Sequence, residues 1–271
     1  AGMLATGLTR DRRLRLFIDV GTNSEIALGS VDRVVATAAP AGPAFEAAQI
    51  RCGMRASEGA IEGVRVRDGD VELDVIGDCE PVGMCGSGLV DAVAELAHVG
   101  LLDHSGRYIP DEQAAERFAP ELAARLTKIG VERVFVLHWR GSECDPVESV
   151  FLSQRDVREL QFAKASIATG WQILARELGV DPAEITQVLL AGSFGAYLTP
   201  LSAVRIGLVP KLALPRIVSA GNVAGEGAKI AALSLRERAE AESILREVQY
   251  VELSGRADFN DLFIDQLGFP G

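Results

Sequence analysis

The sequence predicts an α/β fold in which helices flank a mixed β-sheet, and three observations support this class. Residues 14–20 (LRLFIDV) form a continuous apolar run typical of a buried strand. Residues 154–178 place apolar side chains at alternating steps of three and four, as in an amphipathic helix. Residues 185–191 (ITQVLLA) form a second buried strand that runs into a glycine-rich turn. Because strands and helices alternate, we expect the helices to cover the sheet.

The remaining elements follow from local patterns. Asp68-Gly69-Asp70 is a turn signal that predicts a hairpin of residues 64–67 and 71–76. Ser153 is expected to cap the helix over 154–178, with Asp156 three residues later in a capping-box arrangement. Strands are further predicted over 25–28, 34–38 and 133–137, and helices over 87–99, 112–126 and 224–248, the last interrupted near Ser234.

Composition excludes several classes of function. The chain has 271 residues and a net charge of −11, so it would repel a nucleic acid backbone. Its four cysteines form no CxxC pair, which excludes a zinc or ferredoxin-type site and favours reduced thiols. No secretory signal or apolar run of membrane-spanning length is present. We therefore expect a cytoplasmic protein without nucleic acid or membrane partners. The early arginines (Arg10, Arg12, Arg13 and Arg15) are expected to form a solvated segment.

The first motif that carries chemistry lies between the first two strands, at Asp19-Val20-Gly21-Thr22-Asn23. A glycine at the bend lets the backbone approach a phosphate, and turn N–H groups together with Thr22 and Asn23 can donate hydrogen bonds to it. Asp19 can hold magnesium, directly or through water, or orient an attacking water. The same pattern also fits an ordinary hairpin.

The second motif is the turn Gly192-Ser193-Phe194-Gly195 after the strand over 185–191. Glycines remove side chains where a base or a phosphate could lie, although a tight strand-to-helix corner is an equally simple explanation. Lys164 lies on the apolar stripe of the long helix, with Gln161 one turn away on the same face. Lys164 either extends its ammonium to water along an apolar surface or reaches a ribose or phosphate at a cleft.

Two segments keep open roles. Residues 41–55 (AGPAFEAAQIRCGMR) fit either a loop that lines the core or part of the cleft. Cys85 stands between glycines, and with no cationic neighbour in sequence it is expected to be a buried, unreactive thiol rather than a redox centre.

The order of these motifs resembles the second half of the actin-like ATPase superfamily, which includes acetate and sugar kinases and heat-shock chaperones (ASKHA, with a ribonuclease-H-like lobe). The segments DVGTNSEIAL, GMCGSGLVDAVAEL, DVRELQFAKASIATG, LLAGSFGAYL and IGLVPKL, in this order, resemble more closely the reductive activases of corrinoid proteins. The resemblance covers about residues 17–270.

The resemblance implies ATP and Mg²⁺ as cofactors. Asp19 would be the catalytic residue and would hold magnesium through water, and Gly21, Thr22 and Asn23 would hold phosphates. Gln161 and Lys164 would contact adenosine, and Gly192, Ser193, Phe194 and Gly195 would form the floor beneath it. The family couples ATP hydrolysis to electron transfer from an N-terminal [2Fe-2S] domain onto cob(II)amide, which gives the cob(I)amide used by corrinoid methyltransferases.

Neither a cluster-binding cysteine pattern nor a first DxGT hairpin is present in this sequence. We therefore expect residues 1–271 to be the C-terminal half of an ATPase domain, with a sub-lobe over about 40–150, and the [2Fe-2S] cluster to belong to a missing N-terminal region. The parent protein would be the activase, a homodimer that serves a corrinoid protein, and the fragment alone would be inactive. The alternatives are a docking or dimerisation module of the same fold and a kinase of a small metabolite.

Overall fold

The computed structural model describes residues 1–141 and 145–270, and the chain forms two compact units. Unit 1 consists of Ala1–Gly42 and Lys164–Gln266, and unit 2 of Pro43–Ala163 and Leu267–Gly271. The longest helix, α5 (Gln154–Leu178), begins in unit 2 and ends in unit 1. The sub-lobe expected over about 40–150 stays a prediction.

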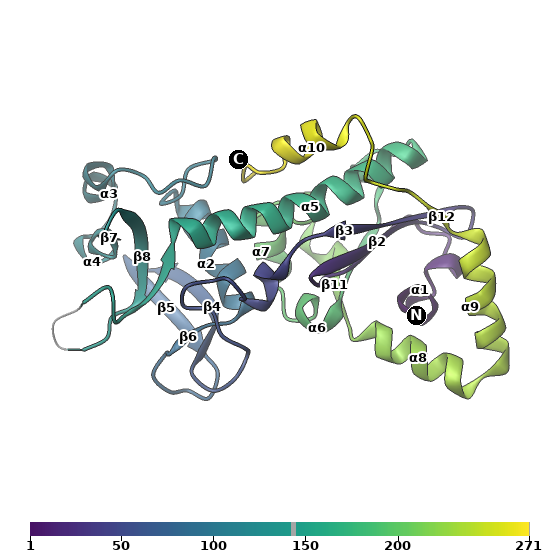
Figure 1. Cartoon of the computed structure of the whole chain (residues 1–271), viewed down its shortest axis with the longest axis horizontal. Coiled ribbons are helices and arrows are strands. Elements are labelled where there is room, and N and C mark those ends of the chain that lie inside the picture. Colours follow the sequence, from purple (N-terminus) through teal and green to yellow (C-terminus); the bar gives the residue numbers. More distant parts are fainter. Residues whose placement is uncertain (142–144, 271) are drawn as a thin grey trace. The chain divides into compact units, whose positions relative to one another are not determined.

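Unit 1 is built on a six-stranded mixed sheet with the strand order β11-β10-β1-β2-β3-β12. β2, β3, β11 and β12 are labelled in Figure 1. β1 pairs in parallel with β10 and antiparallel with β2, so the C-terminal ends of β1 and β10 meet at one edge of the sheet. The strands are β1 (Arg15–Asp19), β2 (Asn23–Gly29), β3 (Val34–Pro40), β10 (Gln187–Ala191), β11 (Ile217–Gly221) and β12 (Gln249–Tyr250). The two edge strands β11 and β12 were not predicted. β12 has only two residues, both exposed, and β11 has one buried residue among its five, so neither shows the apolar run of a buried strand.

Both faces of this sheet are buried. One face packs against α1 (Gly2–Thr6) and α8 (Val223–Leu233). The other face packs against α5 at Gly170, where an added Cβ atom would lie 2.6 Å from Ile26 Cδ1. Each large apolar side chain buried here contributes about 1.5–3 kcal/mol. The core on the first face comprises Leu8, Phe17, Ala27, Val34, Leu189, Ala191 and Val223.

The beginning of α5 confirms the predicted cap. The Asp156 N–H donates to Ser153 Oγ at 3.2 Å, and the Ser153 N–H donates to Asp156 Oδ2 at 2.9 Å. Val157, Leu160 and Leu174 are fully buried, as the stripe predicted. Neither α5 nor any other helix within the described ranges is long and apolar enough to cross a membrane.

The interruption predicted near Ser234 is also confirmed. Ser234 has extended dihedrals (φ −135°) and separates α8 from α9 (Leu235–Glu247). Its hydroxyl accepts a hydrogen bond from the Glu237 N–H at 3.3 Å, which caps α9. Four further helices among the described residues of unit 1 were not predicted, namely α1, α6 (Gly192–Gly195), α7 (Pro200–Arg205) and α10 (Phe259–Asp265).

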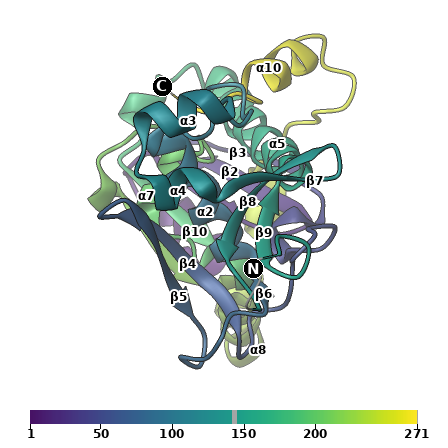
Figure 2. The same ribbon diagram turned by 90° about the vertical axis from the view of Figure 1, so that its left-hand side faces the viewer.

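Unit 2 contains two three-stranded sheets, β5-β4-β6 and β7-β8-β9 (Figure 2). The predicted hairpin is confirmed, and the helix predicted over 87–99 is α2 (Gly86–Val99). The strands are β4 (Ala60–Arg67), β5 (Asp70–Val75), β6 (Gly83–Met84), β7 (Leu126–Ile129), β8 (Glu132–His138) and β9 (Val150–Ser153).

The single helix predicted over 112–126 is wrong. The segment forms two short helices, α3 (Asp111–Arg117) and α4 (Pro120–Ala124), and then enters β7 at Leu126. Pro120 explains the break, because it lacks an N–H and forces the preceding Ala119 out of helical dihedrals (ψ 147°).

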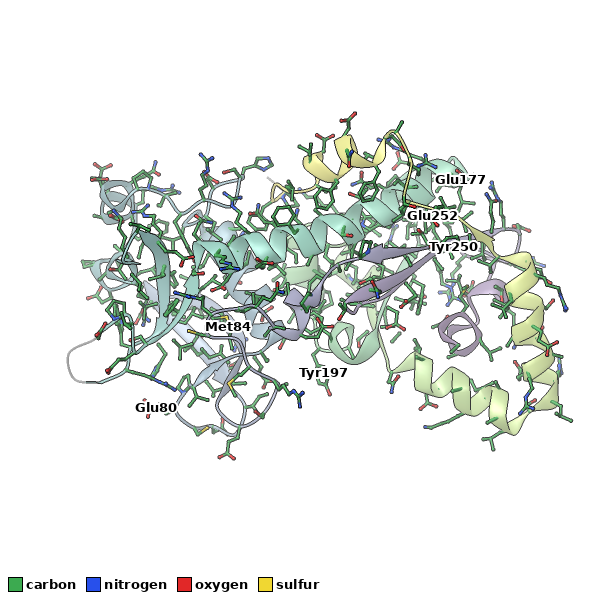
Figure 3. The ribbon with its side chains drawn as sticks, in the orientation of Figure 1. Glu80, Met84, Glu177, Tyr197, Tyr250 and Glu252 are labelled. Atoms are coloured by element: carbon green, nitrogen blue, oxygen red, sulfur yellow. The ribbon has the colours of Figure 1, made fainter. Side chains whose placement is uncertain are left out.

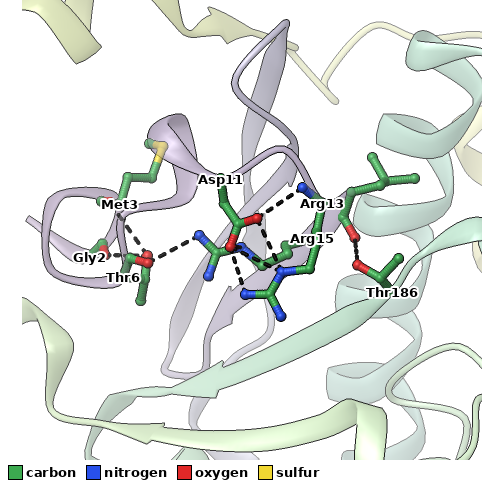
Figure 4. Close-up of polar contacts among 8 residues, drawn as sticks. Gly2, Met3, Thr6, Asp11, Arg13, Arg15 and Thr186 are labelled. Atoms are coloured by element: carbon green, nitrogen blue, oxygen red, sulfur yellow. Dashed lines mark hydrogen bonds and ion pairs between the residues drawn. The ribbon is translucent and has the colours of Figure 1, made fainter.

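The expectation of a solvated arginine segment holds only in part. Arg15 is 5% exposed, and its guanidinium donates to the Thr6 carbonyl at 3.1 Å and pairs with Asp11 at 3.4 Å (Figure 4). The hydrogen bond from Arg13 holds the pKa of the Asp11 carboxyl well below its usual range. Arg15 is therefore a structural residue beneath the N-terminal helix, whereas Arg13 remains exposed.

Candidate functional site

The tip of the β1–β2 hairpin lies in unit 1 and is held by a buried serine. The Ser24 hydroxyl donates to the Gly21 carbonyl at 3.0 Å and accepts from the Gly21 N–H at 3.3 Å. The Thr22 carbonyl accepts hydrogen bonds from the amides of Ala41 and Gly42, at 3.0 and 2.9 Å. The Thr22 and Asn23 side chains stay exposed. Hydrogen bonds therefore fix the backbone of the tip, while these two side chains face the solvent, where a ligand could reach them.

The glycine corner after β10 lies directly against this hairpin. Asp19 and Ala191 are partners across the parallel strands, and the Val20 N–H donates to the Ala191 carbonyl at 3.0 Å. Gly192 has φ +96°, and an added Cβ atom would lie 2.6 Å from Asp19 Oδ1 and 2.7 Å from the Val20 carbonyl oxygen. Only glycine fits this corner without a shift of its neighbours. The two sequence motifs therefore meet at one edge of the sheet.

The remaining residues of the corner are described in part. Gly195 is buried, and an added Cβ atom there would lie 3.3 Å from Val20 Cγ2. Phe194 is half-buried in the short helix α6. The predicted Ser193 side chain lies outside the part of the structure that is described.

Two carboxyl groups share the sheet face at the hairpin. Asp19 of β1 and Glu25 of β2 are cross-strand partners. Burial raises the pKa of the Asp19 carboxyl, and burial together with the charge of Asp19 raises the pKa of Glu25. In the described residues no hydrogen bond to the Asp19 carboxylate is found. At Asp19 the positive charge of the N-terminus partly opposes the effect of burial on the pKa.

These residues fit a magnesium ion that is shared with a ligand. Mg²⁺ keeps several waters and usually binds one or two carboxylates together with substrate phosphates. Among the described residues no cluster of three or more His, Cys, Asp or Glu side chains could enclose a metal by itself. Asp19, beside the exposed hairpin tip, would supply the carboxylate. Water molecules and phosphate oxygens would complete the coordination of the ion.

Lys164 belongs to unit 1 and is only 1% exposed, so its ammonium does not extend to water along the surface. Burial lowers its pKa to about 8. Two residues further along α5, Ser166 Oγ donates to the Pro40 carbonyl at 2.8 Å, and Pro40 pairs with Asn23 of the hairpin. The assignment of Lys164 to a ribose stays a prediction.

Gln161 belongs to unit 2, where its amide is fully used. Its Nε2 donates to the carbonyls of Ser105 at 3.1 Å and Leu267 at 2.7 Å, and its Oε1 accepts from Arg158 at 2.7 Å. Gln161 is 1% exposed. A contact with adenosine would require these hydrogen bonds to break, so the predicted role has no direct support from the geometry.

Sequence reasoning missed Ser24 and assigned no definite role to residues 41–55. The spacing of Ser24, three residues after Gly21, was the available signal, because serine hydroxyls often bond the backbone of nearby turns. The amides of Ala41 and Gly42 brace the hairpin, and the Arg51 N–H donates to Asp156 Oδ1 at 3.0 Å. Through its backbone amides, this segment therefore supports the tip of the β1–β2 hairpin and the start of α5.

Cys85 is buried, as expected. Its Sγ lies 3.4 Å from the Ile61 carbonyl oxygen and 3.3 Å from Ser87 Oγ. Both neighbours are neutral, and a buried thiol in such surroundings packs as a small apolar side chain.

The sheet order, the braced hairpin and the glycine corner define an ASKHA lobe, the fold of acetate and sugar kinases, heat-shock chaperones and actin. Residues 13–271 match the model of the family described as the C-terminal domain of RACo, the ASKHA domain, and the chain belongs to this family.

Known proteins of similar sequence and structure carry related names. The chain is 36% identical over 262 residues to the corrinoid activation enzyme RamQ of Eubacterium limosum, with 95% of this chain and 43% of RamQ covered. It is 25% identical to the [Co(II) methylated amine-specific corrinoid protein] reductase of Methanosarcina barkeri, with 99% and 48% covered. The solved structure of a reductive activator for corrinoid, iron-sulfur protein superimposes with a TM-score of 0.85 at 35% identity, with 99% and 42% covered. The chain thus spans less than half the length of these relatives.

Proposed function

We propose that this chain is the nucleotide-binding part of a corrinoid reductive activase, in which ATP hydrolysis is coupled to the reduction of a corrinoid protein from cob(II)amide to cob(I)amide. The observation that carries this proposal is the contact of Gly192 with Asp19, which joins the two nucleotide motifs at one edge of a sheet. The names of the relatives support the corrinoid protein as partner.

In this proposal Asp19 holds Mg²⁺ through water and orients the attacking water. The exposed Thr22 and Asn23 bind phosphate oxygens, the missing side chain of Gly21 lets a phosphate approach the backbone, and Gly192 keeps the space beside the carboxylate open. The charge of Mg²⁺ would relieve the repulsion between Asp19 and Glu25.

Hydrolysis needs a second phosphate hairpin, which this chain lacks. We propose that it belongs to the rest of a longer, cytoplasmic and homodimeric protein. A [2Fe-2S] cluster in that protein would supply the one electron that converts Co(II) to Co(I). The chain alone is then expected to bind Mg-ATP weakly and to hydrolyse it negligibly.

Titration calorimetry with Mg-ATP tests the binding site. We expect Asp19→Asn to weaken binding by at least about tenfold, because one charged contact with the metal is lost. Asp32→Asn is the matched control, since Asp32 is an exposed aspartate in the turn between β2 and β3, at the other end of the sheet. Without Mg²⁺ the difference between wild type and Asp19→Asn should shrink.

Submicromolar binding that is unaffected by Asp19→Asn would contradict the assignment. No binding of ATP or ADP by the wild-type chain, in calorimetry or thermal shift, would instead favour a docking module of the same fold.

A further inference from the structure

The outer edge of β3 in unit 1 is only partly covered by another strand. β12 pairs with β3 at Val35 and Ala36 alone. The next residue, Val251, donates its N–H to the Ala36 carbonyl at 2.8 Å, and its own carbonyl accepts the Thr37 hydroxyl at 2.7 Å. The chain then leaves the sheet, so in the described structure the last part of β3 pairs with β2 but has no strand on its other side.

Ala38, a half-buried residue of β3, is the position at which the backbone loses its neighbour on the β12 side. The Ala36 carbonyl points toward β12, and backbone groups alternate in direction along a strand, so the N–H and C=O of Ala38 point the same way, away from β2. Within the described residues no backbone hydrogen bond to Ala38 from that side is found. An open strand edge of this kind is a template for a further strand.

A cavity of about 530 Å³ lies at this place and has the size of a specific binding pocket. One wall is β3, at Ala38 and Pro40, and the other wall is the segment between β12 and α10. The Phe259 ring adds an apolar surface, stacked on Phe263 with 6.0 Å between the ring centroids. The full lining is Ala38, Pro40, Glu252, Leu253, Ser254, Gly255, Arg256, Phe259 and Asn260.

The charge of the cavity comes from Glu252. Glu252 lies on the segment that follows β12 (Figure 3). Hydrogen bonds from the Ser254 hydroxyl at 2.8 Å and the Ser254 N–H at 3.1 Å lower the pKa of the exposed Glu252 carboxyl, so it stays ionised. The positive charge of Arg256 is balanced by ion pairs with Asp258 at 2.9 Å and Glu177 at 3.8 Å. The chain as a whole carries −11. A basic group therefore complements this cavity best.

We propose that the open edge of β3 at Ala38, together with this cavity, binds an extended peptide segment of a partner protein that carries a lysine or arginine. The peptide backbone pairs with the N–H and C=O of Ala38, as in other cases of strand addition. One side chain packs against Phe259 and Pro40, and the basic side chain reaches Glu252. The inference does not rest on nucleotide binding, and its test is made without nucleotide.

The probe is a synthetic peptide, acetyl-Val-Lys-Val-Thr-Val-amide, added to the ¹⁵N-labelled 271-residue chain. We expect NMR shift changes centred on the amides of Ala38, Glu252 and Asn260. Ala38→Pro should weaken binding about three- to tenfold, since it removes one backbone donor. Proline is tolerated here because this N–H takes no part in the β2–β3 pairing.

Three further measurements separate the contributions of charge and backbone. Glu252→Gln should weaken binding and reduce its dependence on salt, whereas Glu247→Gln, an exposed acid on α9, should change neither. A peptide with glutamate in place of lysine should bind more weakly. A peptide with alternate amides N-methylated cannot form the strand pairing and should not bind, which keeps the test valid even if Ala38→Pro fails to fold.

Equal binding of the N-methylated peptide, or shift changes located away from Ala38 and Glu252, would overturn the proposal. The same holds if the wild-type chain shows no shift changes at millimolar peptide, or if the acidic peptide binds better than the basic one.

Discussion

Gly192 approaches the carboxylate of Asp19 so closely that a Cβ atom on residue 192 would lie 2.6 Å from Asp19 Oδ1. These residues are 173 positions apart in the sequence, yet Asp19 ends β1 and Gly192 directly follows the parallel strand β10. The glycine corner therefore lies directly beside the carboxylate that ends β1. A side chain at residue 192 should therefore lower the free energy of unfolding, which can be measured.

The first prediction concerns this contact. Gly192→Ala is expected to destabilise the chain by about 2–4 kcal/mol, because alanine is strained at φ +96° and its methyl group collides with Asp19 and Val20. Gly179→Ala is the matched control, since Gly179 also has positive φ (+68°) but no atom lies within 4 Å of its added Cβ. That variant should lose only about 1 kcal/mol. Urea unfolding of both variants makes the comparison, and equal losses would show that the contact with Asp19 is not tight.

The second prediction concerns the buried amine of Lys164. Its pKa in the folded chain is about 8, below the ordinary 10.5, because burial disfavours the charged form. The resulting cost to stability is therefore full below pH 8 and disappears as the pH rises toward 10.5. Relative to Lys164→Met, the wild-type chain should gain about 2 kcal/mol of unfolding free energy between pH 7 and pH 10.

Denaturant unfolding at several pH values measures this gain. Lys229→Met is the control, because Lys229 is exposed and its ammonium stays in water. A difference between wild type and Lys164→Met that does not change with pH would show that the amine is charged at pH 10 and at pH 7 alike.

The third prediction concerns Asp156, which is fully buried at the start of α5 and accepts the N–H groups of Ser153 and Arg51. Asp156→Ala leaves two backbone donors without acceptors and should cost about 2–4 kcal/mol. Ser153→Ala removes only the bond to the Asp156 N–H and should cost about 1 kcal/mol. Glu159→Ala, on the surface of the same helix, should stay within about 0.5 kcal/mol of wild type. Thermal unfolding ranks the three, and a loss for Asp156→Ala no larger than for Ser153→Ala would show that the Arg51 contact contributes nothing.

Several elements could be predicted because their signals are local. The β1–β2 hairpin, the β4–β5 hairpin, the cap of α5 and the break at Ser234 each depend on residues within a few positions of one another. The helix over 112–126 failed for a local reason as well, because the break that Pro120 imposes was overlooked beside the helical pattern around it. Edge strands such as β12 gave no signal, since two exposed residues carry no periodicity.

The sequence by itself determined the central strands β1, β2, β3 and β10, the long helix, and the glycines and aspartate that mark a nucleotide motif, because propensity and periodicity act over short distances. Only the tertiary structure decided that Asp19 and Gly192 touch, that the amide of Gln161 is bonded within unit 2, and that β12 stops short of Ala38. The physical reason is that pairing between distant strands depends on the packing of the whole sheet, which no local pattern encodes.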